Sequence, residues 1–361
     1  MISPKTRSAI SRIIPFVITW FVSSIVYTLL ERGILGKLDY YPSTGNPYDF
    51  KSTLIITPIG SLFVGLLIGI SEVFYLNELF AKKSFTQKIL VKVLIYFTTI
   101  VSFLFGLSII GNAIQLNVPL NDRTAWMNAW LFISNFSFWG VAVFVAYGIT
   151  VSLFFAEVSS NLGSGVLHNF LKGKYHKPIE EDRIFMFLDM KSSTTIAESM
   201  GHLKYFEMLK LYFADLTDPI INNGGEIYQY VGDEVVISWK VADGIRSNNC
   251  VACFFAMKRQ LKSRESYYVE KFGLLPSFKA GLHTGRVTTG EIGVVKKEII
   301  FTGDVLNTTA RIQSLCNTYH VDLLISGQLL KLLHLDPSQE VKAIGETELR
   351  GRDEKVMLYT L

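Results

Sequence analysis

Long apolar runs dominate the first 157 residues, whereas residues 180–361 mix apolar and polar positions as an ordinary globular domain does. A helix needs about 20 apolar residues to cross a hydrocarbon core of roughly 30 Å. Four runs have suitable lengths: Ile13–Leu30, Leu54–Leu76, Ile89–Ile114 and Trp130–Phe155. We therefore predict an α-helical membrane domain of four transmembrane helices over residues 1–156. A cleaved signal peptide is disfavoured for the first run, because no small-residue cleavage pattern follows it and three further runs do.

Basic residues indicate how these helices are oriented. They gather in the N-terminal tail and in the connection between the second and third runs: Lys5, Arg7, Arg12, Lys82, Lys83 and Lys88. Cytoplasmic loops carry an excess of Lys and Arg, so we expect both segments on the cytoplasmic side, although the opposite loops are also partly basic. An even number of spans then places everything after Phe155 in the cytoplasm. The pattern predicts a multi-pass protein of the cell (inner) membrane, surrounded by membrane lipid.

Two ionisable residues, Glu72 and Lys92, fall within or near the apolar runs. An ionisable group at membrane depth is often functional, but a long side chain near a helix end can also extend to the interface. We expect the second arrangement for both residues. After the last run, residues 157–181 form a connector with helical apolar spacing that ends near Gly173 and Pro178, and we expect it to pack rather than to act as a passive tether.

Two predicted strands in the second half each lead into a carboxylate. The apolar run Phe185–Leu188 precedes Asp189, and Glu226–Val231 leads through a glycine into Asp233, after which residues 234–239 resemble the returning strand of a hairpin. Hard cations such as Mg²⁺ prefer carboxylate oxygens and are often shared with substrate phosphates. The two aspartates therefore predict a divalent-metal site.

A small-residue turn, Ser192, Ser193 and Thr194, follows the first of these aspartates and opens an amphipathic helix predicted over residues 196–221. Backbone N–H groups and hydroxyls at such a turn, supported by the helix dipole, suit phosphate oxygens. We expect these three residues to contact a polyphosphate substrate.

Composition narrows the function further. The formal net charge of +4 is too small and too dispersed to indicate nucleic-acid binding. Cys250 and Cys253 form a C-x-x-C pair, which would suit a zinc or redox site. Residues 249–261 nevertheless have helical apolar spacing, and no second pair completes a zinc set. We therefore expect both cysteines on the buried face of a helix.

Several short motifs follow one another along the second half. They are Phe187-Leu188-Asp189, Gly232-Asp233, His283-Thr284-Gly285 and Gly303-Asp304, the last followed by Asn307 and Arg311 on one face of a predicted helix. In this order and spacing, the residues from about 184 to the C-terminus resemble the class III nucleotidyl (adenylyl and guanylyl) cyclases. The full chain resembles membrane-anchored bacterial adenylate cyclases with a four-helix membrane region. The resemblance implies an α+β, ferredoxin-like catalytic domain over residues 182–361.

The resemblance also implies a metal site. Asp189 and Asp233 match the family's two metal-binding aspartates, which hold two Mg²⁺ or Mn²⁺ ions per active site. Met190 stands where the family often has an isoleucine whose backbone carbonyl joins the metal shell, and any residue supplies a carbonyl. Such ions activate the attacking ribose 3′ oxygen and neutralise the pyrophosphate leaving group.

Three further residues take substrate roles by the same resemblance. Asn307 matches the residue that orients the ribose, and Arg311 matches the one that stabilises charge on the α-phosphate. Arg350 stands where the family usually has a lysine that contacts the terminal phosphates, so the charge is kept but the donor geometry differs. In this family the aspartates come from one subunit and the Asn/Arg pair from the other. The resemblance therefore implies a homodimer with two composite sites.

The base-selecting positions depart from the family pattern. They hold Gln229 and Ile300, whereas adenylyl cyclases typically use Lys and Asp, and guanylyl cyclases commonly use Glu and Cys. A glutamine amide offers both a donor and an acceptor, which suits adenine, whereas guanine would favour an acidic acceptor. We therefore predict a membrane-bound adenylate cyclase that converts ATP to 3′,5′-cyclic AMP and pyrophosphate.

The sequence is also compatible in part with four other functions. Guanylate cyclase activity stays open, and so does a catalytically silent cyclase-like module for regulation or dimerisation. A diguanylate cyclase, suggested by Gly224-Gly225-Glu226, is disfavoured. That family's signature needs two acidic residues and Phe directly after the glycines, whereas Ile227 and Tyr228 follow Glu226 here. A transporter is disfavoured as well, because the four runs contain no polar, interrupted helix pair.

Overall fold

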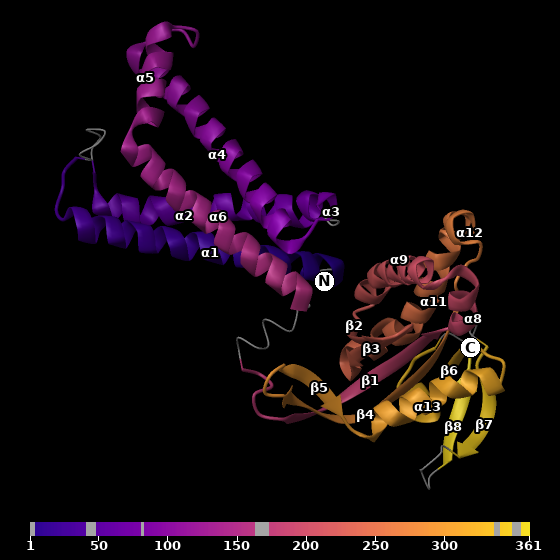
Figure 1. The fold of residues 1–361 in the computed structure, drawn as a ribbon. Helices are drawn as coiled ribbons and strands as arrows, with labels where there is room; N and C mark the ends of the chain where they lie inside the picture. Colours follow the sequence, from indigo (N-terminus) through magenta and orange to yellow (C-terminus); the bar gives the residue numbers. More distant parts are fainter. Residues whose placement is uncertain (1–3, 41–47, 81–82, 163–172, 336–339, 349–354) are drawn as a thin grey trace. The chain divides into compact units, whose positions relative to one another are not determined.

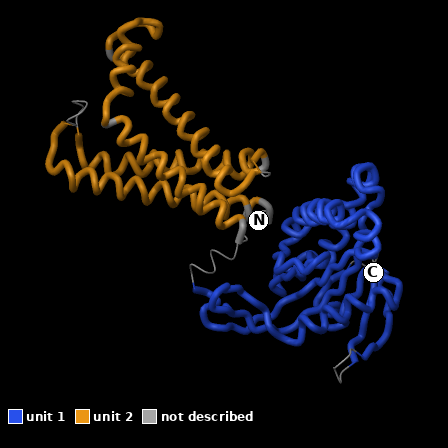
Figure 2. Tube along the Cα trace, in the orientation of Figure 1, with its two compact units in different colours: residues 1–5, 169–361 blue, residues 6–168 orange. Residues whose placement is uncertain are grey.

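The computed structural model describes residues 4–40, 48–80, 83–162, 173–335, 340–348 and 355–361. The chain forms two compact units, residues 6–168 and residues 169–361 with residues 1–5 (Figure 2). The predicted connector over residues 157–181 falls partly on residues 163–172, which lie outside the described residues. Its helical packing, and the predicted boundaries on either side of it, therefore stay predictions.

The first unit is made of helices. Their bounds are α1 Pro4–Leu35, α2 Phe50–Ser71, the π-helical turn η1 Glu72–Leu76, α3 Asn77–Leu79, α4 Phe85–Leu116, α5 Arg123–Ser134 and α6 Phe136–Leu162 (Figure 1). Four stretches are long and apolar enough to cross a membrane: Ala9–Leu35, Phe50–Leu76, Phe85–Ile114 and Phe138–Ser160. The number and order of the predicted long apolar helices are therefore confirmed.

The predicted start of the fourth span is wrong. The apolar run was expected to form one helix from Trp130, but α5 ends at Ser134 and α6 begins at Phe136. Between them Asn135 has an extended backbone, with φ −75° and ψ 135°. Asparagine favours such helix ends because its short amide competes for nearby backbone hydrogen bonds. One polar residue thus divides an otherwise continuous apolar pattern.

Glu72 and Lys92 do not extend to the interface as expected. Lys92 is 2% exposed and Glu72 is 6% exposed, and the Lys92 ammonium forms a short ion pair with the Glu72 carboxylate. One turn away on α4, Lys88 Nζ lies 2.9 Å from Glu157 Oε1 on α6. Each charge is neutralised by a residue on another helix. Glu72 and Lys92 can therefore stay buried and do not need to extend to the membrane interface. The partner of each residue is distant in sequence, which is why the apolar pattern alone gave no sign of it.

Removing one member of the buried pair should destabilise this unit. We expect Lys92→Met to lower the stability by about 3–5 kcal/mol, because the Glu72 carboxylate is then buried without its cation. The double variant Lys92→Met/Glu72→Met should recover most of that loss, since neither charge remains. Thermal unfolding of the full chain in detergent measures both effects, with Lys51→Met at the exposed start of α2 as the control. Equal stability of the single and double variants would contradict this account.

The second unit is built on one mixed sheet of eight strands in the order β2-β3-β1-β4-β6-β8-β7, with β5 paired to β4. Their bounds are β1 Ile179–Met190, β2 Glu226–Val231, β3 Glu234–Lys240, β4 Phe278–Ile292, β5 Glu298–Thr302, β6 Leu323–Ser326, β7 Lys342–Glu348 and β8 Lys355–Thr360. The pair β4–β6 is parallel, and the other pairs are antiparallel. The predicted hairpin of β2 and β3 is confirmed.

Helices cover both faces of this sheet (Figure 1). Their bounds are α8 Ser193–Met200, α9 His202–Asn222, α10 Val241–Ile245, η2 Arg246–Asn248, α11 Asn249–Ser263, α12 Glu265–Phe272, α13 Asp304–Thr318 and α14 Gly327–Leu330. Alternate residues of β1 enter different cores: Met186 and Leu188 pack with residues of α9 and α11, whereas Phe185 and Phe187 pack with Val305 of α13. Coverage on both sides explains why β1 reads as a continuous apolar run rather than an alternating one.

Two sequence expectations for these helices had different outcomes. The helix predicted over residues 196–221 is instead divided at Gly201, whose φ of +82° is left-handed and favours glycine.

Cys250 and Cys253 are fully buried on α11 as expected. Burial raises the pKa of the Cys250 thiol to about 12, which keeps it protonated. The C-x-x-C pair is therefore part of the core.

Candidate active site

Two strand ends bring the predicted metal-binding aspartates together. Asp189 lies at the end of β1 and pairs in register with Glu234, the first residue of β3, so that Asp233 in the preceding turn lies beside it. Burial raises the pKa of Asp189, and the charge of Asp233 raises it further. Lys279 Nζ, 3.3 Å from Asp189 Oδ2, acts in the opposite direction. The carboxylates of the site thus repel each other, and a bound cation would stabilise their ionised forms.

Glu234 is a third acidic group of the site, and sequence reasoning missed it. Burial raises its pKa to about 7, with further contributions from the charges of Asp189 and Asp233. Its position directly after Asp233 was the available signal. Lys279 was missed too, because its role depends on the β1–β4 register that places it opposite Asp189.

Two tyrosines of α9 lie close enough to the acidic groups to be influenced by them. Burial raises the pKa of Tyr205, and the charges of Asp233 and Asp189 add to this effect. Tyr212 is fully buried, and its pKa is raised well above 10 by burial and then by the same two aspartates. Within the described residues, the Tyr212 hydroxyl has no hydrogen-bond partner. Both phenols therefore stay protonated beside the carboxylates.

The donor set suits a hard divalent cation that is completed by other ligands. Within the described ranges, no three His, Cys, Asp or Glu side chains are gathered closely enough to hold an ion by themselves. Mg²⁺ typically takes one or two carboxylates together with waters and substrate phosphates. Asp189 and Asp233 fit that pattern. The Met190 side chain is 2% exposed and belongs to the core, so its backbone carbonyl is what it can offer a metal.

The turn after β1 presents a helix start beside the acidic pair. Ser192 has a left-handed backbone with φ +55°, and α8 begins at Ser193. Helix-start N–H groups have no carbonyl partner within the helix, and Thr194 is exposed to solvent. The three residues predicted to contact phosphate therefore lie within a few residues of Asp189. Arg350, predicted to contact the terminal phosphates, lies outside the described residues.

The helix α13 carries the other predicted catalytic residues. A Cβ at Gly281 of β4 would lie 2.4 Å from the backbone nitrogen of Gln313, so glycine allows α13 to approach the sheet closely. Gln313 Nε2 donates to Asp189 Oδ2 at 3.3 Å. At about 100° per residue, Arg311 lies roughly 200° around the helix from Gln313. Asn307 and Arg311 share that other side of α13, away from the sheet.

Arg311 has an unusual environment. It is half-buried, and among the described residues its buried Nη1 has no hydrogen-bond partner. A buried guanidinium nitrogen without an acceptor is costly. This donor is therefore available to an acceptor from outside the chain once the side chain changes conformation.

The two predicted base-selecting residues come from separate strands. Gln229 lies on the exposed part of β2, and Ile300 lies half-buried on β5. The motif His283-Thr284-Gly285 is structural instead: His283 is 4% exposed, with its Nδ1 at 2.8 Å from Ser326 Oγ.

Comparison with known proteins identifies the family. The model described as "Adenylate and Guanylate cyclase catalytic domain" matches residues 175–361, and the chain belongs to this family. It is 36% identical over 209 residues to Adenylate cyclase 2 of Rhizobium meliloti, a match that covers 58% of each chain. It is 27% identical over 180 residues to Adenylate cyclase 1 of the same organism, covering 48% of this chain and 26% of that relative. Both matches span less than two thirds of the relative's length.

A solved structure agrees with the fold. A bacterial light-regulated adenylyl cyclase superposes with a TM-score of 0.51 at 19% sequence identity, covering 59% of this chain and 61% of that chain. The predicted family and the predicted order of four apolar helices followed by an α+β cyclase domain are therefore confirmed.

Proposed function

We propose that this chain is a membrane-bound adenylate cyclase that converts ATP to 3′,5′-cyclic AMP and pyrophosphate. The observation that carries the proposal is the crowded acidic group of Asp189, Asp233 and Glu234 beside the start of α8, within a cyclase-family domain. The phosphates of a nucleotide are negatively charged, as the carboxylates are. A Mg²⁺ or Mn²⁺ ion would therefore be shared between the phosphates and the carboxylates. The names of the two Rhizobium relatives support the choice of reaction.

Asp189 and Asp233 would hold two divalent ions, with the Met190 carbonyl beside them. Such ions supply charge neutralisation on phosphate oxygens and lower the pKa of an attacking oxygen. The backbone N–H groups after Ser192 are suited to receive phosphate oxygens, with the hydroxyls of Ser193 and Thr194 in support. Arg350 would add a positive charge for the terminal phosphates.

The remaining residues of the site would come from a second copy of the chain. On one chain Gln313 faces Asp189, while Asn307 and Arg311 lie on the other side of α13. A single chain thus carries two half-sites that face different ways, and a symmetric homodimer joins them into two complete sites. In each, Asn307 orients the ribose and Arg311 stabilises the charge that develops at the α-phosphate. The acceptor-free Nη1 of Arg311 supports this role.

The membrane and the base are further parts of the proposal. Four apolar helices would anchor the dimer in lipid. The basic residues between the second and third helices favour the cytoplasmic side for the catalytic unit, where ATP and Mg²⁺ are present. Gln229 would read the adenine edge through its donor and acceptor, while Ile300 shapes the pocket. Guanylate cyclase activity is the competing outcome.

Product formation from ATP and GTP tests this proposal. The purified full-length chain in detergent or liposomes should form cyclic AMP in the presence of Mg²⁺ or Mn²⁺ and none after chelation by EDTA. Cyclic AMP from ATP should exceed cyclic GMP from GTP at equal concentrations. A larger yield of cyclic GMP would reassign the base, and a verified dimer that forms neither product would indicate a silent regulatory module.

A further inference from the structure

Two strands that are not neighbours in the sheet are joined by one tyrosine. Strands β3, β1 and β4 separate β2 from β5 in the pairing order. The rings of Tyr228 on β2 and Phe301 on β5 nevertheless lie 4.8 Å apart between centroids at an interplanar angle of 60°. The backbone N–H of Phe301 donates to the Tyr228 hydroxyl at 3.2 Å. This contact crosses the face of the sheet and links its two strands.

A β-bulge sets the position of Tyr228. The pairing of β2 with β3 shifts register between Ile227 and Gln229, so Tyr228 has no paired residue on β3. Bulges re-aim a side chain and are frequent next to active sites. The extra residue of β2 is therefore the one that reaches β5.

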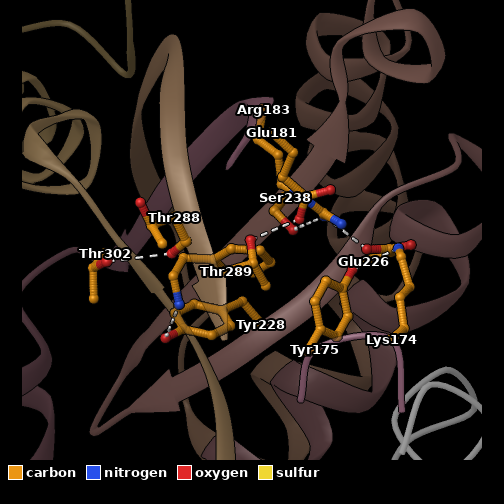
Figure 3. A network of polar contacts seen from close by, with 11 residues as sticks. Lys174, Tyr175, Glu181, Arg183, Glu226, Tyr228, Ser238, Thr288, Thr289 and Thr302 are labelled. Carbon is orange, nitrogen blue, oxygen red and sulfur yellow. Dashed lines mark hydrogen bonds and ion pairs between the residues drawn. The ribbon is translucent and has the colours of Figure 1, made fainter. Parts of the chain in front are cut away.

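The buried guanidinium of Arg183 packs against Phe301, the other residue of this contact. The Arg183 guanidinium lies 4.6 Å from the Phe301 ring centroid, and its Nη1 donates to Glu226 Oε2 at 2.8 Å and to Ser238 Oγ at 3.0 Å. Figure 3 shows Arg183 between Glu226 and Ser238, with Tyr228 on the other side of Thr289. Arg183 is 2% exposed. Because Glu226 begins β2, the guanidinium ties the start of that strand to the ring of Phe301.

The residues next to this link are the ones proposed to contact the base. Gln229 directly follows Tyr228, and Ile300 directly precedes Phe301. We propose that Tyr228 is a positioning residue for base selection, which sets the separation between Gln229 and Ile300. This inference rests on the proposed function, since it concerns how a nucleotide base is distinguished in that site. Discrimination by hydrogen bonds requires fixed donors and acceptors, and a displacement of about 1 Å can cost as much as 10²-fold in rate.

The conservative variant Tyr228→Phe tests the proposal, because it keeps the ring and removes the hydroxyl that accepts from Phe301. We expect the ratio of kcat/KM for ATP to that for GTP to fall about tenfold, mainly through a higher KM for ATP. The full-length chain is assayed with Mn²⁺ and both nucleotides. Tyr230→Phe is the matched control, because it lies on the same strand, is 49% exposed and packs on Phe213; its ratio should stay at the wild-type value.

A second variant, Glu226→Gln, tests the same proposal without depending on the stability of Tyr228→Phe. Glu226→Gln removes the ion pair at the start of β2, and the Glu226 side chain is 62% exposed, so the fold should tolerate it. It should lower the same ratio by a smaller factor, whereas Glu180→Gln, at an exposed ion pair on β1, should not. An unchanged ratio in both Tyr228→Phe and Glu226→Gln, with an active wild type, overturns this inference alone. A wild type that forms no cyclic nucleotide overturns the proposed function, and the inference falls with it.

Discussion

Replacing Asp189 by Asn should lower the rate of cyclic AMP formation by about 10³-fold or more without unfolding the protein. The side chain loses the charge that would hold a divalent ion. Such an ion would supply several kcal/mol of transition-state stabilisation, and each 1.36 kcal/mol is about tenfold in rate. Without metal, the Asp189→Asn variant should be at least as stable as the wild type. Burial and the charge of Asp233 disfavour the ionised form of Asp189 in the wild-type fold, and asparagine carries no charge. Loss of activity and retention of stability therefore go together.

Activity assays and thermal unfolding with and without Mg²⁺ measure both parts of this result. Mg²⁺ should raise the Tm of the wild type and leave that of Asp189→Asn nearly unchanged, since a ligand stabilises only the fold that binds it. Asp182→Asn is the matched control on the same strand, because its side chain is 60% exposed and faces Arg286 outside the site. Wild-type activity in Asp189→Asn, or the same Tm increase with Mg²⁺, would remove Asp189 from the proposed metal site.

The positions of the carboxylates were predictable from the sequence because they follow from local pattern. An apolar strand leading into Asp189, and a hairpin with Asp233 in its turn, are each encoded within a few residues. The same holds for the four apolar helices, whose length alone separates them from a globular core. Local pattern also placed Asn307 and Arg311 on one helix face, since four residues make about one turn.

The features that sequence reasoning missed depend on contacts between distant segments. Lys279 acts on Asp189 through strand register, and no local pattern reveals which strands pair. The Glu72–Lys92 pair depends in the same way on how two helices pack. The division at Gly201 was locally encoded by a glycine, but the amphipathic pattern on both sides outweighed it. A single polar or glycine residue within a periodic apolar pattern can therefore mark the end of a helix even where the pattern continues.

The proposed composite site predicts that two inactive chains restore each other's catalytic activity. Arg311→Ala should lower activity by about 10³-fold or more, in the range known for arginines that stabilise a transferring phosphoryl group. When Asp189→Asn and Arg311→Ala chains are mixed in equal amounts, about half of randomly formed dimers are mixed. Each mixed dimer contains one complete site, made of the aspartates of the Arg311→Ala chain and the α13 residues of the other. Activity should therefore recover to about a quarter of the wild-type value.

The pair Asp189→Asn and Asp233→Asn is the control that separates this arrangement from nonspecific recovery. Both aspartates of a site come from one chain, so no dimer of these two variants contains a complete metal site, and their mixture should stay inactive. Cyclic AMP formation by co-expressed, co-purified chains measures both mixtures, because co-expression allows the dimers to form at random. Recovery in neither mixture, with mixed dimers verified by two affinity tags, would place Asn307 and Arg311 in the same site as the aspartates of their own chain. Gln313 argues against that arrangement, because it contacts Asp189 from the side of α13 that faces away from Arg311.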